Sequence, residues 1–252
     1  AELTSACVQS LLAQSPSAPD EIVLVDNNGQ DDTGRLAELD ARIRVVRLAE
    51  NRGFAGGVNA GIRAAKSELV LVLNNDTQAA DRMLHELRSV LHSDPRIAAA
   101  APVSNHVKGE ARLAVGTNGR EASQRAVLQQ QLAEASARRQ DVANLAGLCL
   151  LLRRRTLDEV GPFDERFGHG NYEDDDFCLR LRLRGHRLVI ARRAFLHHEG
   201  HATFRRLGID LVDELRRRRQ QFERKWRGDL AGAATIAAWD GDTAAAAAAA
   251  SA

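Results

Sequence analysis

Aromatic residues are scarce in this sequence: they make up 4% of its 252 residues, whereas hydrophobic residues as a whole make up 44%. We therefore expect a core built mainly from leucine, valine, isoleucine and alanine. A surplus of one charge is also lacking, because 35 basic residues stand against 34 acidic ones and the net charge is +1. This balance argues for neither nucleic acid nor an acidic molecule as a partner, and we expect no nucleic-acid partner. The length allows one large domain or two small ones.

Cysteine is rare as well, with three residues at positions 7, 149 and 178. The number is odd and the spacing matches no zinc-binding pattern. Cys149 lies in an apolar run and Cys178 in an expected helix, so we predict that both are reduced residues of the core. The absence of a disulfide pattern favours a reducing compartment, the cytoplasm.

Long apolar runs are missing too. No stretch of 18 apolar residues occurs, so a membrane-spanning helix is not expected, and no signal peptide is recognisable. The first residues already show helical spacing of apolar side chains, at Leu3, Cys7 and Leu11. We therefore expect that sequence N-terminal to Ala1 is missing. At the other end, we assign no function to the alanine-rich tail, residues 229–252.

Arginines gather in several short clusters. One interpretation is that these clusters form solvated faces. The alternative is a surface that meets phosphates or anionic lipid, which makes the cluster in 216–219 a candidate for peripheral membrane contact or for contact with another domain. The clusters lie at 153–155, 192–193, 205–206 and 216–219.

Strands and helices are expected to alternate through the first hundred residues. Such alternation predicts a parallel, doubly wound α/β sheet, in which ligands bind beyond the carboxyl ends of the strands. Asp26, the glycine-rich segment 51–57 and Asp76 all follow expected strands. The expected strands are 21–26, 43–48, 69–73 and 97–101, and the expected helices are 3–14, 33–39, 58–66 and 82–92.

The second half is more polar and harder to interpret. Residues 105–145 carry no recognisable motif apart from an expected helix over 121–139. The remaining elements are expected strands at 145–152 and 188–191 and expected helices at 177–184 and 210–226.

Asn74-Asn75-Asp76-Thr77 ends the third expected strand. A carboxylate at the tip of a buried strand suits Mg²⁺ or Mn²⁺, which prefer oxygen ligands. The segment could equally make a turn and cap the next helix. Residues 51–57 have a similar ambiguity: glycines before a helix can present backbone N–H groups to an anion, aided by Arg52, or form a plain tight turn.

Four adjacent acids, residues 173–176, begin an expected helix. The helix dipole favours negative charge there by about 0.3–1 kcal/mol each, which explains one or two of them. The others need a metal, an arginine such as Arg180 or Arg182, or a proton from a substrate, so one is a candidate general base. His197 and His198 beside Glu199 are candidate metal ligands, although lone histidines are more often structural.

Taken together and in this order, these segments resemble the family 2 glycosyltransferases, especially the rhamnosyltransferase-like bacterial members. The resemblance implies a GT-A fold, an α/β architecture with a Rossmann-like, mostly parallel sheet flanked by helices and a mixed extension on the acceptor side. A counterpart of the family's first strand is absent. The segments that carry the resemblance are 21–33 (EIVLVDNNGQDDT), 51–62 (NRGFAGGVNAGI), 74–77 (NNDT), 147–167, 173–180 (EDDDFCLR) and 197–204 (HHEGHATF).

The resemblance also implies an activity and its residues. The activity is the inverting transfer of a hexosyl or deoxyhexosyl group from a nucleotide sugar, with Mn²⁺ or Mg²⁺ on the diphosphate, to a glycan, a lipid-linked sugar or a protein hydroxyl. Asp174 would be the general base with Glu173 and Arg180 beside it, and Arg180 would orient Asp174 or contact phosphate. The metal ligands would be Asp76 and His197 or His198. The nucleotide sugar would be bound by Asp26, Asn28, Asn51, Arg52, Gly53, Gly57, Asn59 and Asn75.

We expect residues 1–104 to form the donor-binding half of one domain and residues 105–228 its acceptor-binding and catalytic half. One departure from the family is Asn74, which stands where the first acid of an Asp-x-Asp element would be. Two other functions stay open: a nucleotidyltransferase that activates a sugar phosphate, and a non-catalytic sugar-nucleotide-binding module of a larger protein.

Overall fold

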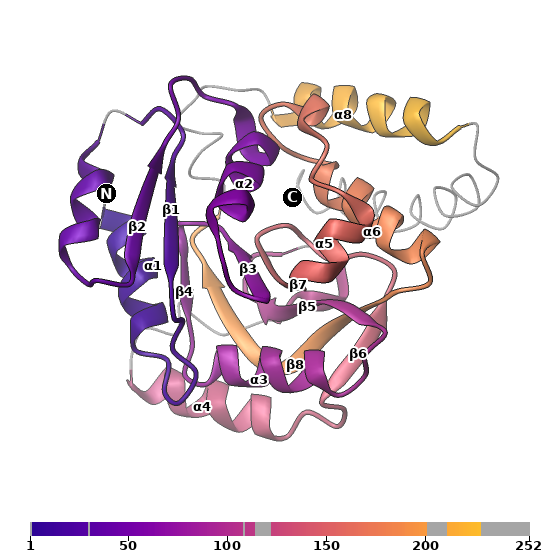
Figure 1. Cartoon of the computed structure of the whole chain (residues 1–252). Coiled ribbons are helices and arrows are strands. Elements are labelled where there is room, and N and C mark those ends of the chain that lie inside the picture. Colours follow the sequence, from indigo (N-terminus) through magenta and orange to yellow (C-terminus); the bar gives the residue numbers. More distant parts are fainter. Residues whose placement is uncertain (1, 30, 108, 114–121, 201–210, 228–252) are drawn as a thin grey trace.

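The computed structural model describes residues 2–29, 31–107, 109–113, 122–200 and 211–227, and its elements are labelled in Figure 1. Its strands form two separate sheets. The smaller one holds β1 (Ile22–Asp26) and β2 (Ile43–Arg47), which run parallel. The larger one has six strands in the order β3-β7-β5-β8-β4, with β6 paired to β8. These six are β3 (Leu69–Leu73), β4 (Thr77–Ala79), β5 (Ile97–Ser104), β6 (Arg139–Val142), β7 (Cys149–Arg153) and β8 (Arg187–His198).

The larger sheet combines parallel and antiparallel pairs. β5 and β8 pair in parallel, whereas β7 runs antiparallel to both β3 and β5, and β4 and β6 run antiparallel to β8. The predicted α/β class is confirmed, and the antiparallel strands form its mixed part. Because β7 comes from the second half of the chain and lies between β3 and β5, the two expected halves share one sheet.

Helices lie on both sides of these sheets (Figure 1). The α-helices are α1 (Glu2–Leu12), α2 (Gly53–Ala64), α3 (Met83–His92), α4 (Ala122–Ala133), α5 (Arg154–Val160), α6 (Glu173–Leu183) and α8 (Leu211–Trp226). Short 3₁₀ helices lie at η1 (Asp32–Glu38), η2 (Gly109–Ala111) and η3 (Glu165–Phe167).

The central strands divide their side chains between two hydrophobic clusters. On β7, Leu150 and Leu152 join the cluster that contains Phe163 and Phe177, while Cys149 and Leu151 join the cluster covered by α1 and α3. This alternation is the two-residue period of a strand. All eight residues of β5 are buried, as expected of a strand with neighbours on both edges and helices on both faces. Cys149 and Cys178 are buried and free, which confirms their predicted place in the core.

Several local expectations are wrong. Residues 53–57 are not a loop before a helix but the first turns of α2, which begins at Gly53. The segment after Asp76 does not cap a helix, because it continues into β4 and α3 begins only at Met83. β4, β6 and α5 have no counterpart among the expected elements, since short segments carry too little periodicity to be read from a sequence.

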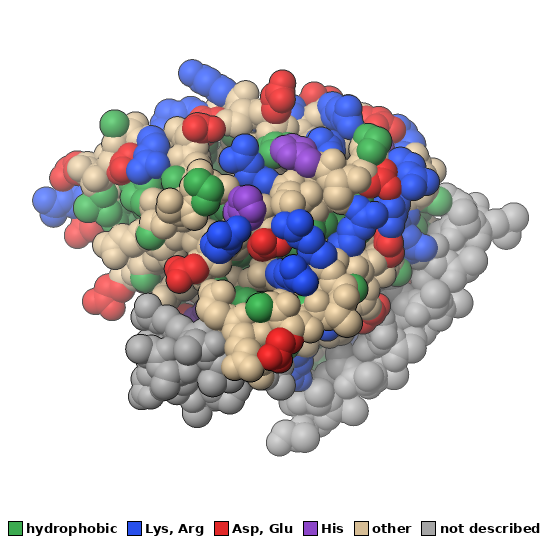
Figure 2. Space-filling model, turned by 90° about the horizontal axis from the view of Figure 1, so that it is seen from below, with side chains coloured by type: hydrophobic (Ala, Val, Ile, Leu, Met, Phe, Trp, Pro, Cys, Tyr) green, Lys and Arg blue, Asp and Glu red, His purple; other side chains and the backbone are tan. Residues whose placement is uncertain are grey.

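The first arginine cluster has a structural use. Arg153 donates to the carbonyl oxygens of Leu91 and Ile97, and Arg154 donates to those of Ser67 and Ala65. These contacts satisfy carbonyl groups at and beyond the ends of α3 and α2. On the described part of the face shown in Figure 2, lysine and arginine side chains alternate with acidic side chains and histidines. None of the helices that the structure describes is long and apolar enough to span a bilayer.

Candidate active site

The polar residues of the site lie at the carboxyl ends of strands. Asp76 follows β3, and His198 is the last residue of β8. The antiparallel pairing of β4 with β8 places Thr77 opposite His198, so Asp76 and His198 become neighbours although they are far apart in the sequence. Asn105 follows β5. Its side-chain amide donates a hydrogen bond to the His198 carbonyl and accepts one from the His198 backbone N–H.

Asp76 and His198 form the part of the site that best fits a metal ion. The Asp76 side chain is 10% exposed, and its Oδ1 lies 3.4 Å from His198 Nε2. His198 Nδ1 lies 2.8 Å from the His106 carbonyl oxygen, a contact that requires a proton on Nδ1 and leaves Nε2 as the ring nitrogen that faces Asp76. Metal-binding histidines are usually anchored in this way. Burial opposes the charged form of His198, but Asp76 and the His106 carbonyl outweigh it and raise the pKa of the imidazole.

His197 points to a different partner. Its Nε2 lies 3.4 Å from Glu199 Oε1, and it stands opposite Gln78 rather than Thr77. Within the described ranges, no group of three or more His, Cys, Asp or Glu residues could hold a metal ion. Asp76 and His198 could therefore supply two ligands, and the remaining positions would have to come from the oxygens of a bound diphosphate and from water.

Asn27 ties the end of β1 to the start of α2, and the sequence interpretation did not include it. Its amide nitrogen donates to the Gly53 carbonyl at 2.8 Å and to Asn51 Oδ1 at 3.2 Å, and its Oδ1 accepts from the Arg52 N–H at 2.9 Å. Asn28, which was expected to contact the nucleotide, is instead an exposed turn residue with φ +62°. The sequence feature that could have identified Asn27 was its position directly after the expected strand 21–26.

Gly53 is placed where no other residue would fit. Its φ is +68°, and a Cβ atom there would lie 1.9 Å from the Gly168 carbonyl oxygen. Its N–H donates a hydrogen bond to Asn51 Oδ1 at 2.9 Å. Gly57 lies against Asn27, with 3.4 Å between a built Cβ and Asn27 Nδ2. These glycines therefore bring α2 against β1 and against the turn at Gly168.

Arg52 and Asn59 join α2 to the second half of the chain. Arg52 forms an ion pair with Glu165 at 2.6 Å. Asn59 is 2% exposed, and its amide bonds the Phe163 backbone twice and Glu165 Oε1 once. We expected Asn59 to contact the nucleotide, whereas in the structure its hydrogen-bonding groups are buried and bonded to protein. Glu165, which the sequence interpretation did not include, contacts the side chains of both Arg52 and Asn59.

Asp26 and Asn75 lie at the mouth of the site. Asp26 Oδ1 accepts from the Gly29 N–H at 2.7 Å, and Arg47 Nε is 3.9 Å from its other oxygen. Asn75 is exposed and donates to Thr4 Oγ1 at 2.9 Å, which fixes the first turn of α1 beside the end of β3. Both side chains line the large cavity described below.

Asp174 occupies the first turn of α6. Its Oδ2 accepts from the Gly147 N–H at 2.8 Å, and its Oδ1 accepts from the Asp175 N–H at 3.0 Å. A Cβ on Gly147 would lie 3.2 Å from Asp174 Cβ and 3.5 Å from Phe54, a residue of α2 that lines the cavity. Asp174 and Phe54 therefore both flank Gly147, and Asp174 itself is not among the described residues that line the cavity.

Glu173 is held in an unusual environment. The residue is 5% exposed, and its Oε2 is buried without a hydrogen-bond partner. Burial raises the pKa of Glu173 well above its ordinary value, and the neighbouring charge of Asp174 raises it further. A carboxyl group in this position favours its neutral, protonated form.

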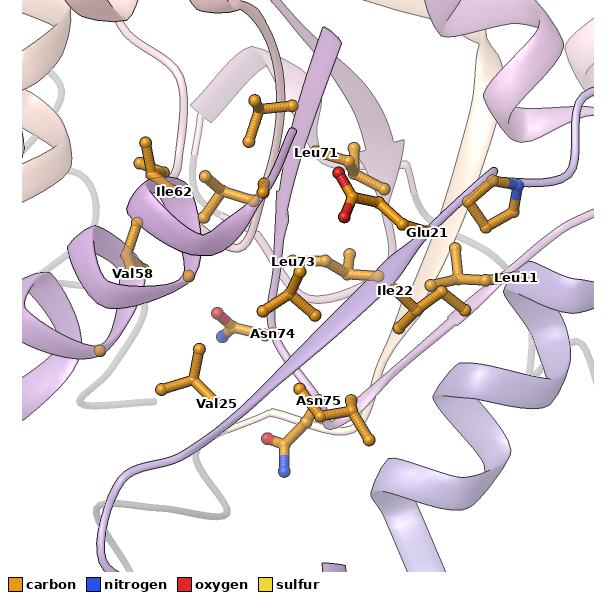
Figure 3. A pocket seen from close by; sticks show the side chains of 18 of the residues that line it. Leu11, Glu21, Ile22, Val25, Val58, Ile62, Leu71, Leu73, Asn74 and Asn75 are labelled. Atoms are coloured by element: carbon orange, nitrogen blue, oxygen red, sulfur yellow. The ribbon is translucent and has the colours of Figure 1, made fainter. Parts of the chain in front are cut away.

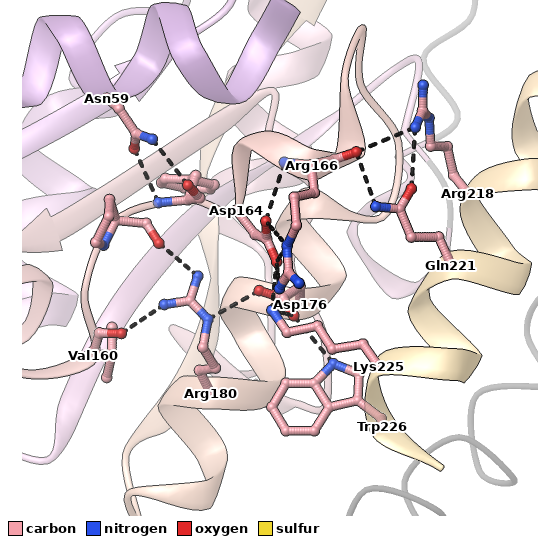
Figure 4. A network of polar contacts seen from close by, with 12 residues as sticks. Asn59, Val160, Asp164, Arg166, Asp176, Arg180, Arg218, Gln221, Lys225 and Trp226 are labelled. Atoms are coloured by element: carbon pink, nitrogen blue, oxygen red, sulfur yellow. Dashed lines mark hydrogen bonds and ion pairs between the residues drawn. The ribbon is translucent and has the colours of Figure 1, made fainter. Parts of the chain in front are cut away.

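Asp176 and Arg180 serve the packing of α6 and α8 (Figure 4). Asp176 is fully buried and is bonded by Arg180 Nε at 2.9 Å, Lys225 Nζ at 2.5 Å and Trp226 Nε1 at 3.1 Å. Arg180 also donates to the carbonyl oxygens of Val160, Gly161 and Pro162. We expected Arg180 to orient Asp174 or to contact phosphate. Its i,i+4 spacing pairs it with Asp176 instead of Asp174, and a contact with phosphate stays a prediction.

A cavity of about 1270 Å³ opens at this edge of the sheets. Its mouth, beside the carboxyl ends of β1 and β3, is polar. Aliphatic side chains line its middle, and charged residues such as Glu21 and Arg153 line its opposite end. In Figure 3, Asn74 and Asn75 lie at one end, while Val25, Val58, Ile62 and Leu73 surround the interior. Asp26, Asn51, Gly53 and Asp76 also line it. The mouth could hold a nucleotide, since it combines carboxamides, a carboxylate and the amino end of α2.

The α/β fold places a polar site at the carboxyl ends of its strands, and solved structures specify this fold as GT-A. A mannosyltransferase from Pyrobaculum calidifontis, in complex with GDP-Man and Mn²⁺, matches with a TM-score of 0.62 and 19% identity, covering 100% of this chain and 76% of that one. The structure of GalNAc-T7 with UDP, GalNAc and Mn²⁺ matches with a TM-score of 0.61 and 15% identity, covering 79% of this chain and 42% of that one.

Sequence comparison identifies the family to which the chain belongs. The model of glycosyl transferase family 2 matches residues 1–161, and the chain belongs to this family. The O-antigen biosynthesis protein RfbC of Myxococcus xanthus is 30% identical over 79% of this chain and 16% of its own length. The N-acetylglucosaminyl-diphospho-decaprenol L-rhamnosyltransferase of Mycobacterium tuberculosis is 27% identical over 77% of this chain and 71% of its own length. An uncharacterised protein of Sinorhizobium fredii, y4gI, is 25% identical over 88% of this chain but only 26% of its own length.

Proposed function

We propose that this domain transfers a sugar from a nucleoside-diphosphate sugar to an acceptor hydroxyl, with inversion at the anomeric carbon. Membership of family 2 and the GT-A fold support a glycosyltransferase. The observation that carries the proposal is the pairing of Asp76 with His198 at 3.4 Å, in which the His106 carbonyl anchors the imidazole. Asp76 lines the mouth of a cavity that a nucleotide could enter. A divalent cation bound there would neutralise the charge of the leaving diphosphate.

In the proposed reaction, the acceptor oxygen attacks the anomeric carbon while the bond from that carbon to the diphosphate oxygen breaks. Asp174 takes the proton of the acceptor hydroxyl. The hydrogen bonds from the Gly147 and Asp175 backbones hold the Asp174 carboxylate in place. The turn over Gly53 and Asn27 shapes the wall on which the nucleotide would lie.

The acceptor is proposed to be a glycan or a lipid-linked sugar. The Mycobacterium tuberculosis relative is named for a sugar linked through diphosphate to decaprenol, and the Myxococcus xanthus relative for O-antigen biosynthesis. Such an acceptor would place the domain at the cytoplasmic face of a membrane. The exposed arginines of α8 are candidates for that contact.

The function is tested by release of nucleoside diphosphate from a panel of nucleotide sugars in the presence of Mn²⁺. We expect Asp174→Asn to lower turnover by about 100-fold or more, because a positioned base contributes about 10²–10⁴-fold, and to leave the donor Kd nearly unchanged. Asp175→Asn is the matched control, because its carboxylate contacts Asn144. Full activity in Asp174→Asn would refute the assigned base.

The metal assignment is tested by calorimetric titration of the donor with and without Mn²⁺. Asp76→Ala and His198→Ala should lose the Mn²⁺-dependent gain in donor affinity, whereas His197→Ala should keep it because His197 faces Glu199. Equal affinity in all three variants would contradict the site. Release of pyrophosphate instead of nucleoside diphosphate would indicate a nucleotidyltransferase, and binding without turnover would indicate a non-catalytic module.

A further inference from the structure

One side of α1 carries polar side chains although it is buried against the rest of the protein. Thr4, Cys7 and Ser10 lie three residues apart on this side, and Gln14 continues the row just beyond the end of the helix. Thr4 and Gln14 are each 4% exposed. Buried polar side chains need hydrogen-bond partners, and all four find them in residues 74–84. We call these four side chains the polar face of α1.

The first two residues of the polar face contact the turn between β3 and β4. Thr4 Oγ1 accepts a hydrogen bond from Asn75 Nδ2 at 2.9 Å. Cys7 Sγ lies 3.7 Å from both the Asn74 carbonyl oxygen and Thr77 Oγ1. The Thr77 hydroxyl in turn donates to the Asn74 carbonyl at 2.6 Å. The turn is thus closed by its own threonine and held from one side by α1.

The last two residues of the polar face bond β4 and the segment after it. Ser10 Oγ accepts a hydrogen bond from the Ala79 N–H at 3.0 Å. The Gln14 amide donates to the Ala80 carbonyl at 3.0 Å and accepts from the Leu84 N–H at 3.2 Å. β4 is paired with β8 along its other edge. The polar face therefore takes the place of a neighbouring strand on the edge of β4 that faces α1 (Figure 1).

The register of β4 decides whether Asp76 meets His198. The pairing of Thr77 with His198 brings the two side chains to 3.4 Å, and the Asp76 carbonyl accepts from the Glu199 N–H at 3.0 Å. β4 has three residues, TQA, without the apolar alternation that specifies register in longer strands. Fixing this register requires contacts on the other edge of β4, and the polar face of α1 supplies them.

We infer that the polar face of α1 positions Asp76 for the divalent cation, an inference that rests on the proposed function for the identity of this ligand. Ser10 acts by holding β4, and Thr4 acts by orienting the carboxamide of Asn75 beside Asp76. Both are positioning residues and not metal ligands. Without them, Asp76 and His198 would be held at a less constant separation, and a cation would bind more weakly, because binding groups must be kept within about 0.5 Å of the productive geometry.

Single substitutions on α1 test this inference. Ser10→Ala removes the acceptor of the Ala79 N–H, and Thr4→Val removes the acceptor of Asn75 in a side chain of nearly the same shape. Ser5→Ala is the matched control for Ser10→Ala, because Ser5 lies on the same helix and its hydroxyl accepts a hydrogen bond within that helix. Thr4→Ser keeps the hydroxyl and should behave like the parent.

The first measurement is amide hydrogen exchange of the protein without metal or donor. We expect the Ala79 N–H to exchange about fivefold faster in Ser10→Ala, as after the loss of one hydrogen bond. The Glu199 N–H, which bonds the Asp76 carbonyl, should exchange faster in both Ser10→Ala and Thr4→Val, although neither substitution touches it. Amides of β5 should not change. Equal exchange of Glu199 in these variants, the Ser5→Ala control and the parent would overturn the inference.

The second measurement is calorimetric titration with UDP, GDP, CDP, ADP and dTDP, with and without Mn²⁺. For the nucleotide that the parent binds most tightly, we expect the gain in affinity from Mn²⁺ to fall about tenfold in both variants, as when a group that orients a metal ligand is removed. The affinity without Mn²⁺ should not change. In an Asp76→Ala background, which already lacks the gain, Ser10→Ala should have no further effect.

A lower Tm with an unchanged gain from Mn²⁺ would overturn the inference, because it would show that the polar face serves stability alone. If the parent itself gains nothing from Mn²⁺, the metal assignment of the proposed function fails. The exchange of the Glu199 N–H, which needs neither metal nor nucleotide, then still decides whether the polar face positions Asp76.

Discussion

Single side chains in this protein derive their roles from partners that are distant in the sequence. Asp76 meets His198 through the register of β4 on β8, and Asp174 accepts a hydrogen bond from the Gly147 N–H. Adjacent acids consequently have different roles. Asp176 is neutralised by Lys225 and Arg180, Asp174 is held by backbone N–H groups, and Glu173 is buried with one oxygen unbonded.

The environment of Glu173 leads to a prediction about stability and pH. Its pKa in the folded protein lies above the unfolded value, which is about 4.3. The folded state therefore binds more protons, and stability falls as pH rises from the unfolded pKa towards the folded one. Glu173→Gln replaces the acid with a neutral group of the same shape. We expect the variant and the parent to be similarly stable near pH 4 and the variant to be more stable above neutral pH.

Denaturant unfolding across this pH range measures the difference. Glu38→Gln is the control, because Glu38 is exposed on η1. If the stability difference between Glu173→Gln and the parent does not grow as pH rises, Glu173 is not a carboxyl with a raised pKa.

At the scale of elements, α8 is attached to the site through polar contacts. Arg218 and Gln221 both donate to the Arg166 carbonyl, and Lys225 joins Asp164 to Asp176. Phe222 adds an apolar contact with Phe167 and Leu179. Because Asp176 lies in the first turns of α6, this attachment fixes the helix that carries Asp174.

Removing the lysine should loosen α8. Lys225→Met leaves the buried carboxylate of Asp176 with only Arg180 and Trp226 as partners. We expect a loss of about 1–3 kcal/mol in the free energy of unfolding, the usual cost of leaving a buried polar group under-satisfied, and faster proteolysis within α8. Arg224→Met is the matched control on the same helix, since Arg224 bonds only a carbonyl of its own helix. Equal stability and cleavage of the two variants would count against the attachment.

At the scale of the whole molecule, the two halves of the chain are joined both in the sheet and at the site. β7 and β8 of the second half pair with β3, β4 and β5 of the first. At the site, Gly53 meets Gly168, and Arg52 and Asn59 meet Glu165. The walls of the donor site therefore depend on contacts between the halves and not on either half alone.

Gly53→Ala tests the closest of these contacts. A left-handed φ costs alanine about 1–2 kcal/mol, and the new Cβ would also collide with the Gly168 carbonyl at 1.9 Å. Gly109→Ala is the matched control, because Gly109 has φ +69° with nothing within 4 Å of a built Cβ. We expect Gly53→Ala to lower Tm clearly more than Gly109→Ala and to weaken donor binding. Equal changes in Tm would mean that the turn at Gly168 moves freely.

The sequence by itself determined the elements that depend on local pattern. Apolar runs placed β1, β2, β3 and most of α3 within a few residues, and the ordered segments between residues 21 and 204 together indicated the family. These features are local because strand and helix periods, turn residues and glycine-rich segments are properties of neighbouring residues. The same reasoning could not find β4, whose three residues are held by pairing with β8.

Only the tertiary structure decided which polar residues meet. It paired Asp76 with His198, assigned Arg180 to Asp176, buried Asn59 against Phe163 and brought Asn27 to Gly53. It also placed β1 and β3 in different sheets of the described part of the chain. Such pairings depend on strand order and register, which are set by the packing of the whole core and cannot be read from the spacing of residues along the chain.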